Sequence, residues 1–152
     1  MRLALKVPPP VVLLIFGILM WFVGSRVPGG QVDFDNQLAT AIAVGILGLI
    51  ININAIIGFR RAKTTVNPLD PGKATQLVVG GVFRLSRNPM YLGILVVMTG
   101  WAIWIGSFYN LALLALFIYY ITEFQIKPEE EVLRPLFDET YADYCSKVRR
   151  WI

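Results

Sequence analysis

The stretch RNPMYLGILVVMTGWAIWIGSFYNLALLALFIYYITE, residues 87–123, decides the fold, because the 35 residues between its terminal Arg87 and Glu123 carry no charge. A helix rises about 1.5 Å per residue, and one membrane-spanning helix needs about 20 apolar residues. The run is therefore long enough for two short helices that turn near residues 106–110. A hairpin returns to the membrane face that it left. The sequence thus predicts that Arg87 and the carboxylates after Glu123 lie on one surface.

The composition indicates an integral membrane protein, because 56% of the 152 residues are hydrophobic and only 16% are charged. Two further uncharged stretches, Val7–Ser25 and Asn36–Phe59, are each long enough to cross a membrane once. We therefore expect an all-α protein with four transmembrane helices, the last two forming a tight hairpin, in one domain over residues 1–152. The expected spans are 8–26, 37–59, 89–105 and 108–125, with a cytoplasmic loop over 60–88 and a tail over 128–152.

The N-terminal stretch Val7–Ser25 resembles a signal peptide, since Arg2 and Lys6 precede it. It is longer than a secretory apolar core of about 7 to 15 residues, and no small-x-small cleavage site follows, which predicts a retained span.

The basic residues give the orientation of the spans. Two lie before the first span, 6 in the 60–87 segment and 5 in the tail, whereas the two opposite loops hold only Arg26. The positive-inside rule then predicts that both termini and the polar loop are cytoplasmic. Attraction to anionic headgroups and topology account for the net charge of +4 without a nucleic acid partner.

The chain has one cysteine, Cys145, and no histidine. It therefore lacks the usual ligand of zinc and copper and the usual general base near pH 7, and we expect no metal site. Chemistry here depends on carboxylates, hydroxyls, backbone groups or the reactivity of a cofactor.

The 60–88 loop is rich in turn formers, Asn67-Pro68, Asp70-Pro71-Gly72 and Gly80-Gly81, yet it carries the apolar Leu77-Val78-Val79. Such a loop either wraps around a ligand or dips into the membrane interface. At the end of the second span, Asn52 either bonds a neighbouring helix or lines a ligand cavity.

The sequence of the tail predicts an amphipathic helix that starts near Pro128, with three glutamates at the positive end of the helix dipole. Apolar residues recur in it at steps of three and four: Leu133, Leu136, Phe137, Tyr141, Tyr144 and Val148. The tail either lies along the headgroups or caps the loop. We expect a kink at Pro135 and an interfacial anchor at Trp151-Ile152.

Several motifs in order resemble the isoprenylcysteine carboxyl methyltransferase family and its phospholipid methyltransferase relatives. They are GVFRLSRNPMYLG at 81–93, PEE at 128–130, the spaced Leu133, Phe137, Tyr141 and Tyr144, and VRRW at 148–151. The resemblance covers roughly residues 67–152. It implies a multi-pass membrane enzyme, of the prokaryotic inner membrane here, that uses S-adenosyl-L-methionine and releases S-adenosyl-L-homocysteine. It also implies a lipophilic or lipidated acceptor that enters from the bilayer.

Carried over onto this chain, the resemblance implies a set of cofactor-binding residues: Thr75, Gln76, Leu77, Val78, Phe83, Asn88, Pro89, Met90, Tyr91 and Glu129. It further implies catalytic roles for Glu129, Tyr91 and Arg87. We assign Asn52 and Gln125 to the acceptor. A carboxylate can accept bonds from a ribose or an amino group, and an aromatic ring can cover an adenine or a sulfonium, so these roles are chemically reasonable.

Four residues depart from the family pattern. Asn88 replaces the histidine of the eukaryotic prenylcysteine enzymes, Phe83 a tyrosine and Asp138 a glycine. Gln125 stands in place of an arginine thought to meet the substrate carboxylate, which questions a prenylcysteine substrate.

We place carboxyl O-methylation ahead of phospholipid or amine N-methylation. An ionised oxygen needs positioning rather than a base, whereas an amine must first lose a proton, to Glu129, Glu130 or Tyr91. The other classes considered are a non-catalytic scaffold and a small transporter. The first three spans lack the acidic residue that proton coupling needs.

Overall fold

The computed structural model describes residues 7–65 and 71–152, and in these residues the regular secondary structure is helical, as predicted. Outside the described residues lie Arg2, Lys6, Asn67, Pro68 and Asp70, on which part of the sequence argument depended. The helices are α1 (Pro9–Arg26), α2 (Gln37–Arg61), α3 (Pro89–Ile105), α4 (Asn110–Ile121) and α5 (Lys127–Lys147). A π-helical segment, Thr122–Ile126, joins α4 to α5, and the loop after α2 contains the short 3₁₀ turns Pro71–Lys73 and Gly81–Arg84.

Proline in the first turn begins α1, α3 and α5, where its missing N–H costs nothing. In the last turn of α2, Arg60 and Arg61 complement the negative C-terminal end of the helix dipole. Three helices of the described chain are long and apolar enough to cross a membrane: α1, α2 and the continuous helix from Asn110. The fourth expected span, α3, is a shorter apolar helix of 17 residues.

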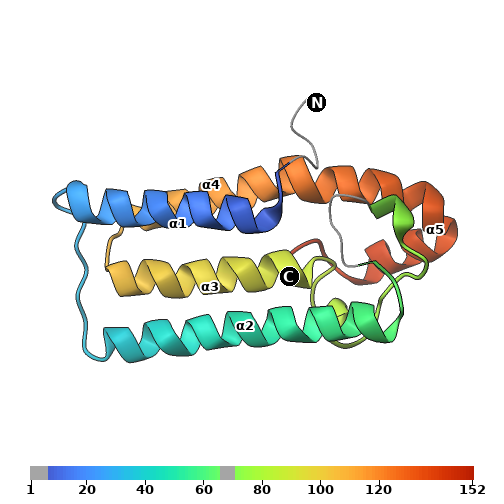
Figure 1. Ribbon diagram of the computed structural model, residues 1–152, viewed down its shortest axis with the longest axis horizontal. Coiled ribbons are helices and arrows are strands. Elements are labelled where there is room, and N and C mark those ends of the chain that lie inside the picture. The colour runs from blue at the N-terminus through green and yellow to red at the C-terminus, as the bar shows by residue number, and fades with distance from the viewer. Residues whose placement is uncertain (1–6, 66–70) are drawn as a thin grey trace.

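Figure 1 shows α3 between α1 and α2, with α5 continuing the direction of α4 and then folding back. Glycines allow α2 and α3 to approach closely. A Cβ added at Gly93 would lie 2.4 Å from the Asn52 amide nitrogen, and one at Gly100 would lie 2.7 Å from Ala41 O. Any side chain at either glycine would therefore separate the two helices.

The turn between α3 and α4 is held by the loop that joins α1 to α2. Gly106 closes α3 in the left-handed conformation, with φ 66°, and its carbonyl accepts the Val32 N–H at 2.7 Å. The Phe108 N–H donates to Gly30 O at 2.7 Å. Both connections thus lie at the same end of the bundle, opposite the loop that follows α2.

The structure confirms one expectation about the tail and corrects another. A helix was expected to start near Pro128, and α5 begins at Lys127, directly after the π-helical segment that joins it to α4. A kink was expected at Pro135, but the non-helical residue is Asp138, with φ 41° and ψ −121°. The chain turns at Asp138 because a single positive φ redirects it more sharply than one missing helical hydrogen bond.

Asp138 adopts a conformation that suits glycine, which is the residue that the resembling family carries there. We expect Asp138→Gly to stabilise the protein by about 1 kcal/mol and to raise its melting temperature by about 2–4 °C. Thermal unfolding in detergent measures this. The control is Glu139→Gly, which places the same residue in helical conformation and should destabilise by about 1 kcal/mol. An equal loss of stability in both variants would show that Asp138 is not strained.

Candidate functional site

A cavity of about 270 Å³ lies at the end of the bundle where the loop after α2 meets the start of α3 and α5. Its walls come from α1, α2, the loop, α3 and α5. The lining residues are Pro9, Pro10, Phe59, Thr65, Pro71, Ala74, Gln76, Leu77, Val78, Phe83, Arg87, Asn88, Pro89, Met90, Tyr91, Ile94, Glu129, Glu130, Leu133, Phe137, Tyr141 and Tyr144. The volume is close to the lower limit of small-molecule sites, about 300 Å³.

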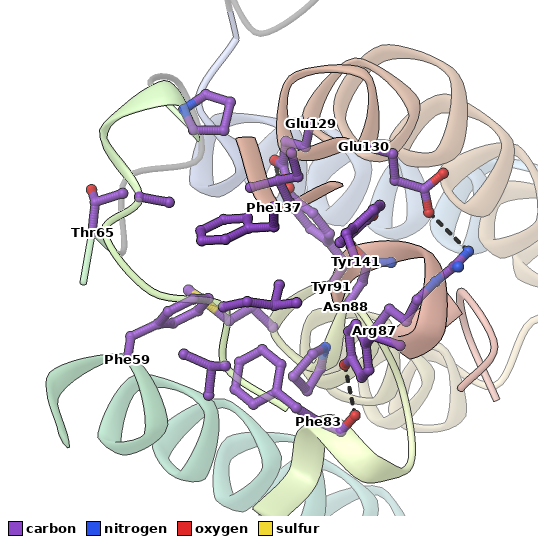
Figure 2. A pocket seen from close by; sticks show the side chains of 18 of the residues that line it. Phe59, Thr65, Phe83, Arg87, Asn88, Tyr91, Glu129, Glu130, Phe137 and Tyr141 are labelled. Carbon is purple, nitrogen blue, oxygen red and sulfur yellow. Dashed lines mark hydrogen bonds and ion pairs between the residues drawn. The ribbon is translucent and has the colours of Figure 1, made fainter. Parts of the chain in front are cut away.

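Aromatic rings form two facing walls of the cavity. Figure 2 shows Phe59 and Phe83 on one side and Phe137 on the other. The rings of Phe59 and Phe83 meet edge to face, with centroids 5.1 Å apart. From α5, the Tyr144 hydroxyl donates to Phe83 O at 2.7 Å. The second half of α5 therefore caps the loop, which decides between the two placements that the sequence left open.

Tyr91 and Glu129 form the polar point of the cavity. Tyr91 comes from the first turn of α3 and Glu129 from the first turn of α5, and the hydroxyl donates to Glu129 Oε1. Burial disfavours the carboxylate and raises the pKa of Glu129 to about 8, while the bond from Tyr91 opposes this rise and the nearby charge of Glu130 adds to it. Glu129 is thus a carboxyl group that a donor or a cation in the cavity would ionise.

Glu130 holds two arginines beside the cavity. Its Oε1 accepts from Arg87 Nη2 at 3.0 Å and from Arg150 Nε at 3.1 Å, and its Oε2 accepts from Arg150 Nη2 at 2.6 Å. The Glu130 residue is only 6% exposed. Arg87 Nε is buried and has no hydrogen-bond partner among the described residues. The ion pairs join α5, the segment before α3 and the end of the chain.

Residues 148–151, which we call the C-terminal strap, lie across the segment that precedes α3. Arg150 O accepts from Ser86 Oγ at 3.3 Å and from Asn88 Nδ2 at 3.0 Å, and Arg149 O accepts from the Arg87 N–H at 3.0 Å. Trp151 donates its indole N–H to Thr122 Oγ1 at 3.1 Å and packs against the core. The interfacial anchor expected at Trp151-Ile152 stays a prediction; the Trp151 ring is partly buried and engaged within the fold, whereas Ile152 is exposed.

Nine of the ten predicted cofactor residues line the cavity: Gln76, Leu77, Val78, Phe83, Asn88, Pro89, Met90, Tyr91 and Glu129. The exception is Thr75, whose hydroxyl donates to Lys63 O at 3.2 Å and whose N–H donates to Thr64 Oγ1 at 3.0 Å. Thr75 thus ties the loop to the end of α2. Arg87 also lines the cavity. Binding and catalysis by these residues stay predictions.

The two predicted acceptor residues lie outside the cavity lining. Asn52 donates to Gly48 O of its own helix at 3.1 Å and faces Gly93 of α3. Gln125 is fully buried in the π-helical segment and donates to Val7 O at 2.6 Å. Their assignment to the acceptor stays a prediction; in the structure Asn52 lies in the contact between α2 and α3, and Gln125 bonds the segment before α1.

The sequence argument assigned no site role to the aromatic residues of α2 and α5. Phe59, Phe137, Tyr141 and Tyr144 all line the cavity, and Arg150 pairs with Glu130 beside it. The apolar stripe of the tail was the available signal, since it faces the loop. In the described residues, no three His, Cys, Asp or Glu side chains gather as a metal site would require.

Comparison with known proteins gives a family match and several relatives. Residues 36–140 match a family model described as phospholipid methyltransferase. An uncharacterized protein of Haemophilus influenzae is 38% identical over 63 residues, which cover 41% of this chain and 100% of that protein. Protein-S-isoprenylcysteine O-methyltransferase of Schizosaccharomyces pombe is 24% identical over 125 residues, 81% of this chain and 53% of that enzyme.

Protein-S-isoprenylcysteine O-methyltransferase B of Arabidopsis thaliana is 27% identical over 103 residues, 68% of this chain and 52% of that enzyme. The chain therefore spans about half the length of the two named methyltransferases. No solved structure matches the chain.

Proposed function

Because the chain belongs to the phospholipid methyltransferase family, to which the isoprenylcysteine carboxyl methyltransferases are related, we propose that it transfers a methyl group from S-adenosylmethionine to a lipophilic acceptor at the membrane. The observation that carries this proposal is the cavity. It gathers the residues of the motifs around 83–91 and 129 beside aromatic rings from α2 and α5.

We further propose that α1, α2, α3 and the helix from Asn110 all cross the membrane, with both termini and the cavity at the cytoplasmic face. Basic residues support this orientation, since Arg60, Arg61 and Arg87 all lie at the cavity end of the bundle. We also propose that this membrane is the inner membrane of a prokaryote, because the Asn-Pro-Met-Tyr motif at 88–91 resembles that of many prokaryotic members of the family. With this topology, a lipid-linked acceptor reaches the cavity from the bilayer without crossing it.

The lining residues suit S-adenosylmethionine in their chemistry. Phe59, Phe83 and Phe137 offer ring faces to an adenine or a sulfonium cation. Glu129 offers a partly buried carboxyl group to a ribose hydroxyl or an amino group. Arg87 Nε, buried and unbonded among the described residues, suits a carboxylate. When bound, the cofactor supplies a methyl group with an already activated leaving group.

In this proposal the protein mainly positions and desolvates the reactants. Tyr91 fixes the orientation of Glu129 through their hydrogen bond, and the ion pairs of Glu130 hold the loop and the C-terminal strap around the cavity. The capping half of α5 excludes water, which favours a reaction that removes charge. An acceptor oxygen ionised at pH 7 then needs no base. The named relatives are O-methyltransferases, which supports carboxyl O-methylation as the reaction.

N-methylation of an amine is the second candidate. It is favoured by Glu129, because the ionised form of a carboxyl group with a pKa of about 8 is a stronger base than an ordinary carboxylate and can take a proton from an ammonium group. The test is incubation of the purified protein in lipid nanodiscs with methyl-labelled S-adenosylmethionine and two acceptors, an S-farnesylcysteine and phosphatidylethanolamine. Base-labile label on the first acceptor supports the ester, and base-stable label on the second supports the amine. The proposal would be refuted if the protein bound no S-adenosylhomocysteine and transferred no label to either acceptor or to a total lipid extract.

The raised pKa of Glu129 predicts how cofactor affinity depends on pH. Below pH 8 most of the free protein carries Glu129 protonated, so binding that needs the carboxylate must release a proton. The affinity for S-adenosylhomocysteine should therefore rise with pH, by up to about tenfold per unit between pH 6 and 8, and level off above that. Calorimetric titration at five pH values measures it. Glu129→Gln should flatten the profile; an unchanged profile in that variant would assign the titration to another group.

A further inference from the structure

The side chain of Asn88 does not cap the helix that it precedes. Asn88 is the N-cap residue of α3, yet its side chain makes no cap bond to the first turn. Asparagine is favoured at this position because its Oδ1 usually accepts a bond from a backbone N–H of that turn. Here the side chain is half-buried and lines the cavity (Figure 2). Its oxygen is therefore available to a partner other than the helix.

The C-terminal strap determines which end of the Asn88 amide faces the cavity. Arg150 O lies 3.0 Å from Asn88 Nδ2. A carbonyl oxygen only accepts hydrogen bonds, so the end of the amide that faces Arg150 O must be the NH₂ group. The other end, Oδ1, accepts no bond from a described residue and is not among the buried atoms without a partner. The atom of Asn88 that stays open to a ligand is thus an acceptor.

Ser86 fixes both the strap carbonyl and the backbone of Asn88. Its Oγ accepts the Asn88 N–H at 3.1 Å, so its own proton donates to Arg150 O at 3.3 Å. The Ser86 side chain is fully buried. Arg150 O thus uses one lone pair for Ser86 and the other for Asn88. Turning the Asn88 amide over would place two oxygens against each other and remove one of these two bonds.

Side-chain bonds hold Arg150 O in place over the start of α3. The Arg150 guanidinium donates twice to Glu130, and the next residue, Trp151, donates to Thr122 Oγ1. These partners belong to α5 and to the π-helical segment before it. A change in the Arg150 side chain therefore reaches Asn88 through the main chain.

We propose that the C-terminal strap positions a cofactor-binding residue: Arg150 O holds the Asn88 amide so that Oδ1 accepts a hydrogen bond from an amino or hydroxyl group of the bound S-adenosyl compound. This inference rests on the proposed methyltransferase function, because it assigns the ligand of the cavity. Asn88 contacts the ligand, whereas Arg150 and Ser86 act through Asn88. A ligand carboxylate cannot take this place, because two acceptors repel each other, and it is left to Arg87 Nε. The neighbouring residues 87 and 88 thus have opposite roles, donor and acceptor.

Asn88→Asp tests the polarity of the amide, because it keeps the shape and offers an oxygen to the cavity but cannot donate to Arg150 O when ionised. At pH 8 it should weaken the binding of S-adenosylhomocysteine by about tenfold or more. Hydrogen exchange at 148–151 should rise more than in Asn88→Ala, which brings no second oxygen against the carbonyl. Calorimetry in nanodiscs measures the affinity. Affinity within about twofold of the unchanged protein would overturn the inference.

Arg150→Leu loosens the strap and leaves the Asn88 side chain unchanged. It should weaken the binding of S-adenosylhomocysteine by about three- to tenfold and raise hydrogen exchange at 148–151. The matched control is Arg149→Leu, which removes the same charge from an exposed side chain that makes no hydrogen bond or ion pair with a described residue. Its affinity should stay within about twofold. Equal affinities in the two leucine variants would contradict a positioning role for the strap.

Nuclear magnetic resonance of the unchanged protein, labelled with ¹⁵N-asparagine, tests the acceptor role directly. The Asn88 side-chain signal is identified by its absence from either variant at this residue. It should move downfield when S-adenosylhomocysteine binds, because a donor at Oδ1 increases the double-bond character of the amide C–N bond. The exposed Asn36, which precedes α2 at the other end of the bundle, should not move. A stationary Asn88 signal in protein that binds the compound would overturn the inference.

Calorimetric binding of S-adenosylhomocysteine to the same samples separates the two proposals. Normal binding by the unchanged protein, with no shift of the Asn88 signal and no loss in Asn88→Asp, overturns the positioning role alone. Absence of binding by the unchanged protein overturns the methyltransferase proposal, and with it the ligand that this inference assigns to Asn88.

Discussion

Replacing Glu129 by glutamine is expected to weaken the binding of S-adenosylhomocysteine by about ten- to a hundredfold. A hydrogen bond to a charged group contributes about 1.5–3 kcal/mol, and every 1.4 kcal/mol is tenfold in affinity. The amide keeps the shape of Glu129 and its bond from Tyr91 but cannot carry a charge. Calorimetry on the protein in nanodiscs measures the loss, and thermal unfolding shows that the variant is folded.

Two matched variants make this result specific. Glu131→Gln removes a charge from the same helical turn at an exposed side chain outside the cavity lining, and it should leave the affinity within about twofold because exposed charges are screened. Tyr91→Phe removes only the donor to Glu129 and should cost about tenfold or less, since a neutral donor contributes about 0.5–1.5 kcal/mol. Equal affinity in the Glu129 and Glu131 variants would contradict a cofactor role for Glu129.

The ends of the apolar helices were predictable because uncharged runs end at charges, prolines and glycines. Helix α3 covers Pro89–Ile105, the residues over which a span was expected; that it crosses the membrane stays a prediction. Between the last two helices, Gly106 provides the turn that its position in the run indicated. The all-helical class and the membrane-spanning length of three helices are confirmed, and so is the family resemblance.

The contacts that the sequence analysis did not predict join residues that lie far apart in the chain. No local sequence pattern indicates that Trp151 donates to Thr122, or that Arg150 O accepts hydrogen bonds from Ser86 and Asn88, which lie more than 60 residues earlier. The positive φ of Asp138 was not predicted, although the glycine that the resembling family carries at this position was a signal for it. These contacts bring the end of the chain and half of α5 over the loop.

The site was predicted more fully on its motif side than on its aromatic side. Residues 76–78, 83 and 88–91 were expected in the cavity and line it. Phe137 and Tyr141 belong to a stripe whose partner, loop or headgroup, periodicity cannot identify. The same ambiguity applies to Asn52, because a polar residue in a span serves a neighbouring helix as readily as a ligand.

Replacing Glu130 by leucine is expected to have the largest effect on stability, a loss of about 3–5 kcal/mol and about 10 °C or more in melting temperature. The Glu130 side chain is 8% exposed and neutralises Arg87, whose side chain is 13% exposed, as well as Arg150. Leucine fills a similar volume but leaves the guanidinium of Arg87 buried without a counter-charge. The C-terminal strap should detach first, because Arg150 loses both of its bonds to the carboxylate.

Hydrogen exchange and thermal unfolding measure this result, and Glu123→Leu is the control. Glu123 pairs with Lys127 in the same helical region, but the pair is exposed by 24% and 45% and should contribute less than about 1 kcal/mol. In Glu130→Leu, exchange should rise at residues 148–151 and 86–88 before it rises in α2 and α3. The double change Glu130→Leu with Arg87→Met should recover part of the lost stability, because it removes the buried charge as well. If the single variants at Glu130 and Glu123 lost equal stability, the buried ion pairs would not hold the loop and the strap together.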